Sequence, residues 1–418
     1  MISAPKGTKD ILPKDIHKWH YIEKIIDNLA LLYGLKEIRT PIFEHTELFT
    51  RGIGETTDVV GKEMYTFTDK GGRSITLKPE GTAGAARAYI ENSLDAQPQP
   101  CKMYYKTPVF RYEKPQSGRL RQHHQFGIEI FGSYSPYADA EAICIARGLF
   151  DAVGIKDLQL RINSIGCPAC RRQYNAALKE YFATHIDKMC DTCAERLAKN
   201  PLRILDCKSP VCGEFAKNAP KMLDYLCPEC EHHHNTVKEA LDACGIKYIV
   251  DPMIVRGLDY YTKTVFEFVS DNIGAQGTVC GGGRYDNLVS ELEGKPAGSV
   301  GFGLGLERLI MVAEATGIKL GEDISPAVYI APLGERQRAE AFALTAALRN
   351  AGISAECDIL DRSLKAQMKY ADKKGYTYVI VLGEEELSRK EAQVKNMADG
   401  TVRTVGLSMM AEFFKEIL

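Results

Sequence analysis

The sequence lacks the features that would assign a chain to a membrane, secreted or repeat class. No run of 18 apolar residues occurs in its 418 residues, and the stretch MISAPKGTKDILP has no apolar core. Neither membrane insertion nor secretion is therefore expected. Internal repeats and low-complexity tracts are also absent. We expect a cytoplasmic protein that makes no contact with a membrane.

An excess of positive charge is also missing. The chain has 53 Lys and Arg residues against 55 Asp and Glu residues, a formal net charge of −2. A molecule with this balance does not attract a polyanion as a whole, so any nucleic acid must contact local basic patches. The composition, 45% hydrophobic and 26% charged, is ordinary for a globular protein, and the length allows two or three domains.

The first half of the chain predicts a sheet-rich α+β arrangement. Apolar residues recur at helical spacing from Trp19 to Tyr33, and Gly34 is a suitable end. The following LKEIRTPIFEHTELF has an extended pattern interrupted by Pro41, which suits an edge or interface strand. Further strands are predicted over 62–68, 74–79, 104–112 and 122–131, and a helix over 82–94.

The pattern changes twice along the rest of the chain. From about 163 to 251 it predicts helices, charged loops and Cys pairs, and it then returns to extended alternation at VRGLDYYTKTVFEFVS. After Pro326, strands alternate with helices, which indicates a small α/β domain with a mainly parallel sheet. We predict a catalytic domain in two parts, over 1–165 and 251–322. An insertion occupies 166–250, and a C-terminal domain occupies 326–418.

A basic hairpin is predicted within VFRYEKPQSGRLRQHHQFGIEIFG, residues 109–132. Arg111 lies near the end of its first strand, and Lys114, Arg119 and Arg121 follow in the turn. Guanidinium groups bind phosphate oxygens two at a time, so strand and turn together could hold a nucleotide and a nucleic-acid end. A solvated charged turn would explain the same residues.

Two further arginines could complete a polyphosphate site. Arg256 lies in VRGLDYYT, and Arg308 in GFGLGLERL at a predicted helix start. The glycines of CGGGRYD, residues 281–283, would let the main chain approach a flat ligand closely. Structural ion pairs and a tight turn are the competing explanations.

Two carboxylates have positions that require a partner. Glu80 lies in LKPEGT, and Glu129 alternates with apolar residues in QFGIEIFG. A buried carboxylate is unfavourable unless it is paired, so we expect an ammonium or imidazole ligand, or an arginine, beside Glu129. A structural salt bridge is equally compatible with this position.

Seven motifs in order resemble the histidyl-tRNA synthetase family, which belongs to the class II aminoacyl-tRNA synthetases. They are PKGTKDILP, RTPIFE, LKPEGT, the hairpin quoted above, VRGLDYYT, CGGGRYD and GFGLGLERL. The resemblance covers nearly the whole chain. It implies an antiparallel catalytic sheet with a helical insertion, a homodimer formed by the first helix and the Pro41 strand, and a small α/β anticodon-binding domain.

The resemblance also implies a reaction and its substrates. ATP with Mg²⁺ would activate L-histidine to histidyl-adenylate, and the histidyl group would pass to the 3′ end of tRNA(His). In this interpretation Arg256 and Arg111 are the catalytic residues, with Arg111 on the α-phosphate. Arg308 and Arg119 would contribute to ATP binding, with Arg308 on the distal phosphates.

The same resemblance assigns the histidine and tRNA contacts. Glu80, Thr82 and Gln125 would receive the α-ammonium group. Glu129 and Tyr261 would read the imidazole, with Tyr260 beside them, and polar groups that need partners would reject other side chains. The turn that carries Lys114, Arg119 and Arg121 would meet the tRNA acceptor end. Lys78 stands where the family pattern leads us to expect arginine.

The resemblance leaves eight paired cysteines unexplained. The pairs are Cys167 and Cys170, Cys190 and Cys193, Cys207 and Cys212, and Cys227 and Cys230. A predicted helix over 171–184 would hold the first two pairs roughly 20 Å apart. We therefore favour a structural zinc site from Cys190, Cys193, Cys207 and Cys212, with the other four as a second site. Reduced thiols at loop corners are the alternative.

Two other functions fit parts of the sequence. A catalytically silent relative, such as the regulatory subunit of ATP phosphoribosyltransferase, shares the catalytic core of the family but should lack the C-terminal domain and some charged contacts. A non-catalytic zinc RNA-binding module would not need a Glu, Gln and Tyr set suited to a free amino acid.

Overall fold

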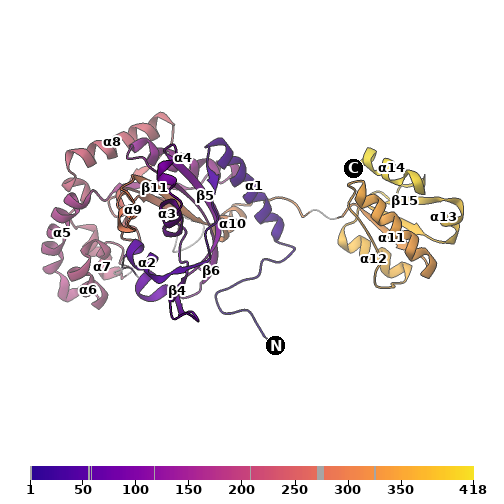
Figure 1. Ribbon diagram of the computed structural model, residues 1–418, viewed down its shortest axis with the longest axis horizontal. Helices are drawn as coiled ribbons and strands as arrows, with labels where there is room; N and C mark the ends of the chain where they lie inside the picture. Colours follow the sequence, from indigo (N-terminus) through magenta and orange to yellow (C-terminus); the bar gives the residue numbers. More distant parts are fainter. Residues whose placement is uncertain are drawn as a thin grey trace. The chain divides into compact units, whose positions relative to one another are not determined.

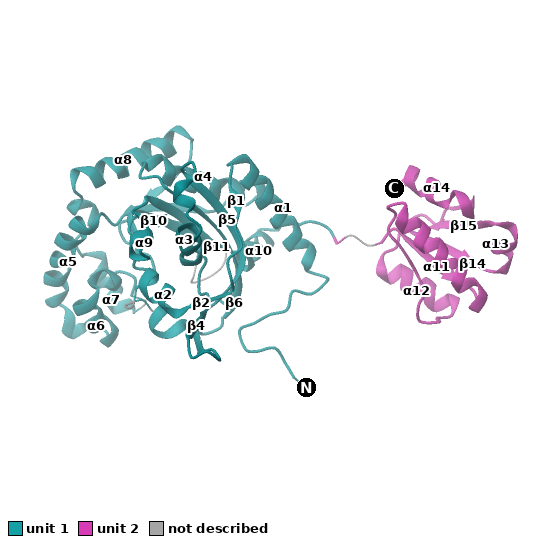
Figure 2. Cartoon of the chain, viewed as in Figure 1, with its two compact units in different colours: residues 1–322 teal, residues 323–418 magenta. Residues whose placement is uncertain are grey.

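The computed structural model describes residues 2–54, 57, 59–116, 118–207, 209–270, 277–323 and 326–418. The chain divides into two compact units, Met1–Glu322 and Asp323–Leu418 (Figure 2). Among the described residues, no helix has the length and apolar character needed to cross a bilayer.

Unit 1 is built on an eight-stranded sheet with the order β1-β5-β6-β11-β10-β9-β7-β8. The central pairings are antiparallel, and only the two edge pairs, β1 with β5 and β7 with β8, are parallel. The antiparallel catalytic sheet expected from the resemblance is therefore confirmed. The strands are β1 (Lys36–Glu37), β5 (Cys101–Phe110), β6 (Gln122–Phe131), β7 (Gln159–Ser164), β8 (Ile249–Val250), β9 (Thr262–Val269), β10 (Thr278–Arg284) and β11 (Ser299–Gly305).

Helices cover one face of this sheet. The covering helices are α1 (Ile16–Leu32), α4 (Pro136–Val153), α8 (Pro228–Ala243) and α10 (Leu306–Ala315). Alternate strand residues, such as Ile128 of β6 and Phe302 of β11, point into the core that these helices close. Helix α4 begins because Ser135 caps it and Pro136 fits its first turn, and it ends at Gly154 with φ of 94°.

The opposite face of the sheet is covered only in part. It packs against α3 (Thr82–Glu91) and α9 (Leu288–Glu291). Helix α2 (Thr46–Ile53) packs on α3, and a three-stranded sheet of order β2-β4-β3 lies beside it. These strands are β2 (Phe43–His45), β3 (Tyr65–Thr68) and β4 (Ser74–Leu77). The uncovered part of this face is where the candidate site lies.

Several predicted elements differ from the structure at their ends. Pro41 lies between β1 and β2 and belongs to neither strand, so the extended pattern that it interrupts forms two short strands. The predicted strand 62–68 begins only at Tyr65, because Val59–Glu63 forms a π-helical turn. The predicted helix 82–94 ends at Glu91.

Residues 166–250, which we call the insertion, fold mainly as helices. Figure 1 shows α5, α6 and α7 together at one side of unit 1, with α1 and α10 at the other. The helices are α5 (Pro168–Ala183), α6 (Asp191–Lys199), α7 (Pro210–Lys217) and α8, and short 3-10 turns such as η4 (Pro201–Ile204) join them. The paired cysteines lie in the apolar core of this segment.

Helix starts set the positions of these cysteines. Cys167, Cys190 and Cys227 are the N-cap residues of α5, α6 and α8, and each has its pair partner three residues later in the first turn. Proline follows Cys167 and Cys227 at the first helical position, where its missing N–H is not needed. The positive end of a helix dipole favours a thiolate, so this placement prepares both sulfurs of a pair as ligands.

Unit 2 contains a five-stranded sheet of order β13-β12-β14-β15-β16. Its helices are α11 (Glu335–Asn350), α12 (Leu364–Lys374), α13 (Glu384–Arg389) and α14 (Met410–Ile417). Its strands are β12 (Val328–Pro332), β13 (Ala355–Cys357), β14 (Tyr378–Leu382), β15 (Glu391–Asn396) and β16 (Val402–Gly406). The predicted α/β character is confirmed.

The predicted mainly parallel sheet of unit 2 is wrong in its second half. Strand β12 pairs parallel with β13 and β14, but β15 runs antiparallel to both β14 and β16. A parallel return needs a crossover of about a dozen residues or more. The stretch between Leu382 and Glu391 is shorter than that, so β15 runs back along β14.

Candidate active site

A cavity of about 430 Å³ opens on the uncovered face of the unit 1 sheet. Its walls come from the start of α3, from β6, β10 and β11, from the turn after Arg111 and from the segment 255–261. Glycines keep its floor clear. A Cβ atom on Gly303 of β11 would collide with the amide of Gln125, and one on Gly281 of β10 would collide with the guanidinium of Arg256.

Glu80 lies at one end of this cavity. Its carboxylate accepts hydrogen bonds from the main-chain N–H groups of Thr82 at 2.6 Å and Ala83 at 2.8 Å, so it caps α3. Burial raises the pKa of Glu80, and these hydrogen bonds offset part of the effect. Gln125 joins it, because its Oε1 accepts a hydrogen bond from Gly81 N–H at 2.9 Å. Glu80, Thr82 and Gln125 therefore stand together on the cavity wall.

Glu129 lies behind that wall and does not line the cavity. Its Oε1 accepts hydrogen bonds from the hydroxyls of Thr82 at 2.8 Å and Tyr105 at 2.9 Å, and its Oε2 accepts one from Tyr285. Among the described residues, the hydrogen bonds to Glu129 come from these three hydroxyls, and no arginine takes part in them. The ammonium or imidazole ligand expected beside Glu129 stays a prediction. Burial raises the pKa of Glu129 to about 8.

Tyr260 and Tyr261 form the wall opposite. Their ring centroids are 4.6 Å apart, and both rings are buried at the cavity edge. Burial raises the pKa of Tyr260 well above its ordinary value, and it raises the pKa of Tyr261 as well. Both phenols therefore keep their protons and can donate hydrogen bonds.

Three arginines line the cavity as well. The Nε of Arg111 donates to the carbonyl of Pro79 at 2.8 Å, and Arg119 forms an ion pair with Glu113. Arg308 at the start of α10 donates to the carbonyls of Gly118 at 2.9 Å and Thr278. Burial lowers the pKa of Arg308, and the neighbouring charges of Arg119 and Arg111 lower it further. An anion beside these arginines would relieve that repulsion.

Arg256 stands beside these groups on the segment 255–261. Its guanidinium forms an ion pair with Glu267 of β9 and lies 5.8 Å from the centroid of the Tyr261 ring. Burial opposes its charge, but the Glu267 carboxylate outweighs this and raises the pKa of Arg256. The charge is therefore held inside the cavity wall.

Lys114 and Arg121 do not line the cavity. Lys114 is exposed, and the guanidinium carbon of Arg121 lies 3.9 Å from the centroid of the Tyr112 ring. The hairpin is closed by Arg111 N–H, which donates to the carbonyl of Arg121 at 2.8 Å. Of the predicted basic residues, Arg111 and Arg119 thus face the cavity and the other two lie on the outer turn.

Lys78, the residue that departs from the family pattern, is buried under the small sheet. Its Nζ donates to the carbonyl and the hydroxyl of Thr40, both at 3.2 Å. Burial lowers the pKa of Lys78 to about 8. It holds Thr40 and does not line the cavity.

Sequence reasoning did not identify three residues of the site. Tyr105 and Tyr285 supply two of the hydroxyls on Glu129, and Glu267 pairs with Arg256. Glu267 carries the same signal as Glu129, a carboxylate within an apolar strand. Tyr285 lies in the CGGGRYD motif, whereas nothing in the sequence distinguishes Tyr105 from its neighbour Tyr104.

The eight paired cysteines form two clusters. One contains Cys190, Cys193, Cys207 and Cys212, and the other Cys167, Cys170, Cys227 and Cys230; in each, the sulfurs lie within 4.8 Å of one another. The Sγ atoms of Cys190 and Cys207 are 3.8 Å apart, and those of Cys167 and Cys170 are 3.5 Å apart. Four sulfurs bound tetrahedrally to zinc at about 2.3 Å would lie about 3.8 Å apart, so both clusters fit this ion.

Main-chain groups point at both clusters. Cys190 N–H donates to the sulfur of Cys212 at 3.3 Å, and Cys227 N–H donates to that of Cys170 at 3.1 Å. Such bonds stabilise thiolates, the form in which cysteine binds a metal. All thirteen cysteines are free thiols in the structure.

Comparisons with known proteins agree across both units. The family model described as histidyl-tRNA synthetase matches residues 7–309, and an anticodon-binding domain model matches 327–417. A histidine–tRNA ligase of Caldanaerobacter subterraneus subsp. tengcongensis is 55% identical over 400 residues, 96% of each chain. The one from Clostridium novyi is 54% identical over 417 residues, 100% of this chain and 99% of the other.

Solved structures show the same likeness. The histidyl-tRNA synthetase of Staphylococcus aureus, solved without ligand, superposes with a TM-score of 0.85 at 43% identity and covers 99% of this chain and 100% of the other. A Bacillus halodurans protein described as an ATP phosphoribosyltransferase regulatory subunit/histidyl-tRNA synthetase shares the fold at 21% identity, with a TM-score of 0.65 over 92% of this chain and 98% of the other.

Proposed function

We propose roles for the residues of this cavity, starting from the finding that the chain belongs to the histidyl-tRNA synthetase family. The chain is a class II aminoacyl-tRNA synthetase that activates L-histidine with ATP and transfers it to the 3′ end of tRNA(His). The observation that carries the residue roles is a single cavity that four arginines line together with a carboxylate, an amide and two tyrosines, Glu80, Gln125, Tyr260 and Tyr261.

The two alternative functions are not favoured. Relatives at 54% and 55% identity over nearly the whole chain are histidine–tRNA ligases. The likeness to the Bacillus halodurans protein, whose name includes a regulatory subunit, is far lower at 21% identity. A zinc RNA-binding module would have no use for the cavity.

The arginines stabilise the charge that moves in the first step. A carboxylate oxygen of histidine attacks the α-phosphorus of ATP, the bond from that phosphorus to the bridging oxygen breaks, and pyrophosphate leaves with the electron pair. Arg111 holds the α-phosphate, and Arg256 supplies positive charge on the side of the attacking carboxylate. Arg308 and Arg119 hold the distal phosphates. Catalysis then consists of positioning and charge stabilisation.

Other residues of the cavity recognise histidine. Glu80, Thr82 and Gln125, which line the cavity, receive the α-ammonium group. Tyr261, with Tyr260 beside it, and Glu129 read the imidazole. Because Glu129 lies behind Thr82, it acts through that hydroxyl or after the hydroxyl has moved. A side chain without ring N–H groups would leave these buried groups unpaired.

Magnesium enters as the partner of the ATP phosphates. Mg²⁺ prefers carboxylate and phosphate oxygens, and the carboxylates of Glu113 and Glu307 line the cavity. We propose these two side chains as its protein contacts. The ion neutralises phosphate charge when it is bound.

The tRNA reaches the cavity past the hairpin turn. Lys114 and Arg121 on the outer turn bind the backbone of the acceptor end, and Arg119 lies between the turn and the cavity. Unit 2 matches an anticodon-binding domain and is the second contact. Within unit 1 we propose a catalytic domain over 1–165 and 251–322 interrupted by the insertion at 166–250, with the anticodon-binding domain over 326–418.

A homodimer and a cytoplasmic location complete the proposal. Leu31 and Leu32 of α1 are 79% and 81% exposed, and Phe43 of β2, just after Pro41, is 57% exposed. Exposed apolar residues on these two elements suit a second copy of the chain. Thirteen free thiols suit a reducing compartment.

We also propose that each cysteine cluster holds one structural zinc ion. Four thiolates leave no open position for water, so the ions would stabilise the insertion and take no part in the reaction. Total zinc by atomic emission, on protein purified without added metal, should give two ions per chain. A metal-free folded chain would refute this part.

Histidine-dependent exchange of labelled pyrophosphate into ATP, without tRNA, tests the central proposal. Exchange should occur with histidine alone among the twenty amino acids, and Arg256→Ala should abolish it. Exchange with no amino acid in folded protein would contradict the function. Full exchange in the variant would contradict the role of Arg256 only.

A further inference from the structure

The segment that carries Arg256 has little support from regular structure. Residues 254–261 form neither helix nor strand, so no ladder of hydrogen bonds fixes their main chain. A second cavity, of about 350 Å³, lies against the segment, and Arg256 and Leu258 line both this cavity and the first. Arg256 and Leu258 thus form a wall between two spaces, whereas Ile254, Tyr260 and Tyr261 at the two ends of the segment pack in the core of unit 1.

The insertion supplies hydrogen bonds to this wall. The Nη1 of Arg203 donates to the main-chain carbonyl of Arg256 at 2.7 Å, and the Nη1 of Arg171 donates to the carbonyl of Tyr261 at 3.1 Å. Between them, Nδ2 of Asn200 donates to Oδ1 of Asp259 at 3.2 Å. Three side chains from the insertion therefore hold Arg256, the middle and the last residue of the segment, while Asn163 of β7 donates to the carbonyl of Ile254 at 3.1 Å.

The cysteine clusters determine where these donors lie. Asn200 and Arg203 lie at η4, between the pair Cys190 and Cys193 and the pair Cys207 and Cys212 of one cluster. Arg171 follows Cys170 of the other cluster directly. Arg203 is only 7% exposed, and its own carbonyl accepts a hydrogen bond from Arg196 at 3.0 Å. Each cluster thus fixes a guanidinium that reaches the catalytic segment.

Arg256 is consequently held at both ends. Its side chain pairs with Glu267 of β9, which also accepts a hydrogen bond from Thr278 at 2.9 Å, while its carbonyl is held by Arg203. The sheet fixes the charge and the insertion fixes the main chain. A displacement of about 1 Å in such a group can cost about 100-fold in rate.

We propose that Arg203 is a positioning residue for adenylate formation: it holds the main chain of Arg256, and the cluster of Cys190, Cys193, Cys207 and Cys212 holds Arg203. The inference rests on the proposed role of Arg256. It assigns the insertion a part in the first step of the reaction, before any tRNA is bound. An insertion that served only to bind tRNA would have no effect on that step.

The decisive experiment compares Arg203→Ala, Arg203→Lys and the wild-type chain in pyrophosphate exchange without tRNA. We expect kcat of Arg203→Ala to fall about 10- to 100-fold, while the Kd for histidine, measured by calorimetry at one site per chain, changes less than about 3-fold. Arg203→Lys keeps a donor and should recover part of the loss. Zinc content and thermal midpoint are measured on each variant, so a folding defect is recognised.

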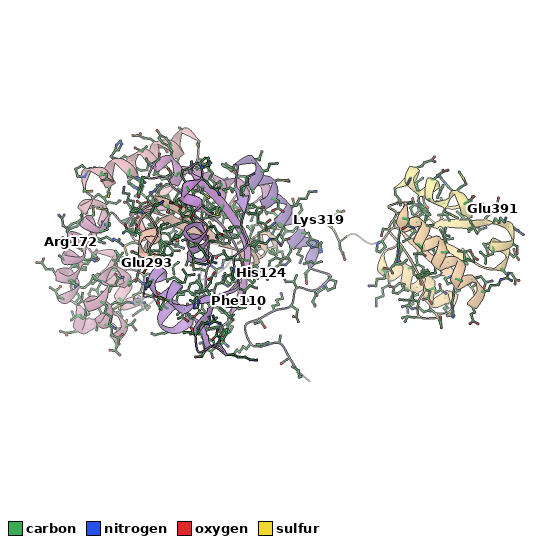
Figure 3. The ribbon with its side chains drawn as sticks, in the orientation of Figure 1. Phe110, His124, Arg172, Glu293, Lys319 and Glu391 are labelled. Atoms are coloured by element: carbon green, nitrogen blue, oxygen red, sulfur yellow. The ribbon has the colours of Figure 1, made fainter. Side chains whose placement is uncertain are left out.

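Arg172→Ala is the matched control. Arg172 is exposed on α5 at the outer side of the insertion (Figure 3) and lines the same second cavity. Its removal should leave the exchange unchanged. Should Arg203→Ala lose zinc or unfold, Arg203→Met decides, because it keeps the length of the side chain and removes the donor. A folded, zinc-loaded Met variant with reduced kcat supports the inference, and one with wild-type kcat overturns it.

Two further results would overturn the inference while leaving the function intact. One is wild-type exchange by folded Arg203→Ala, with or without a defect in tRNA charging. The other is an equal loss in Arg172→Ala, which would mean that the effect is not specific to the contact with Arg256. Absence of exchange in the wild-type chain would instead refute the proposed function.

Discussion

The hydroxyl of Tyr285 donates a hydrogen bond to Oε2 of Glu129, and both side chains are buried. The bond joins the residue that follows β10 to β6 across β11, beneath the cavity residues that we assign to histidine. Glycine at position 301 of β11 makes the contact possible, because a Cβ there would collide with the Glu129 carboxylate.

Tyr285→Phe should weaken histidine recognition. The change removes one of three donors from a buried carboxyl group, and an unsatisfied buried group costs about 1–3 kcal/mol. We expect the KM for histidine in pyrophosphate exchange to rise about 10-fold, with the KM for ATP unchanged. Tyr134→Phe, at a tyrosine that is 53% exposed, is the control. Equal rises in both KM values would contradict a specific role.

The pH dependence of stability should report on Glu129. Burial raises its pKa from 4.5 to about 8, so between these values the folded chain keeps a proton that the unfolded chain has lost. The stabilising contribution is therefore complete below about pH 4.5 and is lost as the pH rises through about 8. Glu129→Gln should remove this slope, which is at most about 1.4 kcal/mol per pH unit.

Thermal midpoints of the wild type and Glu129→Gln from about pH 5 to pH 8 measure this difference. The advantage of the wild type over the variant should shrink as the pH rises. Burial also raises the pKa of Glu80, so only the difference between the two proteins is informative. A constant difference would mean that Glu129 does not titrate in this range.

Arg308→Ala should affect ATP more than histidine. The guanidinium is half-buried beside Arg119 and Arg111 in the cavity, and a lost charge-assisted contact to phosphate costs about 1.5–3 kcal/mol. We expect the KM for ATP to rise at least about 10-fold, with the Kd for histidine unchanged. Arg147→Ala, which removes an ion pair with Asp151 on the helix-covered side, should leave both constants as they are. A rise in the Kd for histidine alone would contradict the assignment of Arg308 to ATP binding.

Cys212→Ser should lower the zinc content from two ions per chain to one. Cys212 is buried in one cluster, and its loss leaves three thiolates around the metal. The thermal midpoint of unit 1 should fall, because the cluster ties η4 to α6 and α7. Cys357→Ser, in β13 of unit 2, should change neither quantity. Equal zinc in both variants would show that this cluster does not bind the ion.

The charged residues of the cavity that we predicted could be found from the sequence because each lies in one of the motifs that resemble the family. Arg111, Arg256 and Arg308 come from three distant segments, and the structure brings all three to one cavity. Pattern alone could not show which partner satisfies a buried acid. An ammonium or imidazole ligand, or an arginine, was expected beside Glu129. The structure places three hydroxyls there, from α3, from β5 and from the residue after β10, because strand order decides which side chains meet.

Strand direction in unit 2 shows the same limit. The sequence predicts strands around Val379 and Val394. Whether these two strands run parallel depends on the length of the connection between them. The cysteine clusters show the opposite case. The length of the helix predicted over 171–184 was enough to favour a cluster that joins Cys190 to Cys207 over one that joins Cys190 to Cys167, because the rise per residue of a helix is fixed.

The cluster of Cys167, Cys170, Cys227 and Cys230 joins the place where the chain leaves the catalytic sheet to the place where α8 leads it back. The segment between Cys170 and Cys227, which contains α6 and α7, is closed at its base by this cluster. Such a segment can be lengthened, shortened or exchanged without changing how the strands on either side align. The sheet can therefore fold with a different insertion in this place. The reaction depends on this one, because Arg203 and Arg171 hold the segment that carries Arg256.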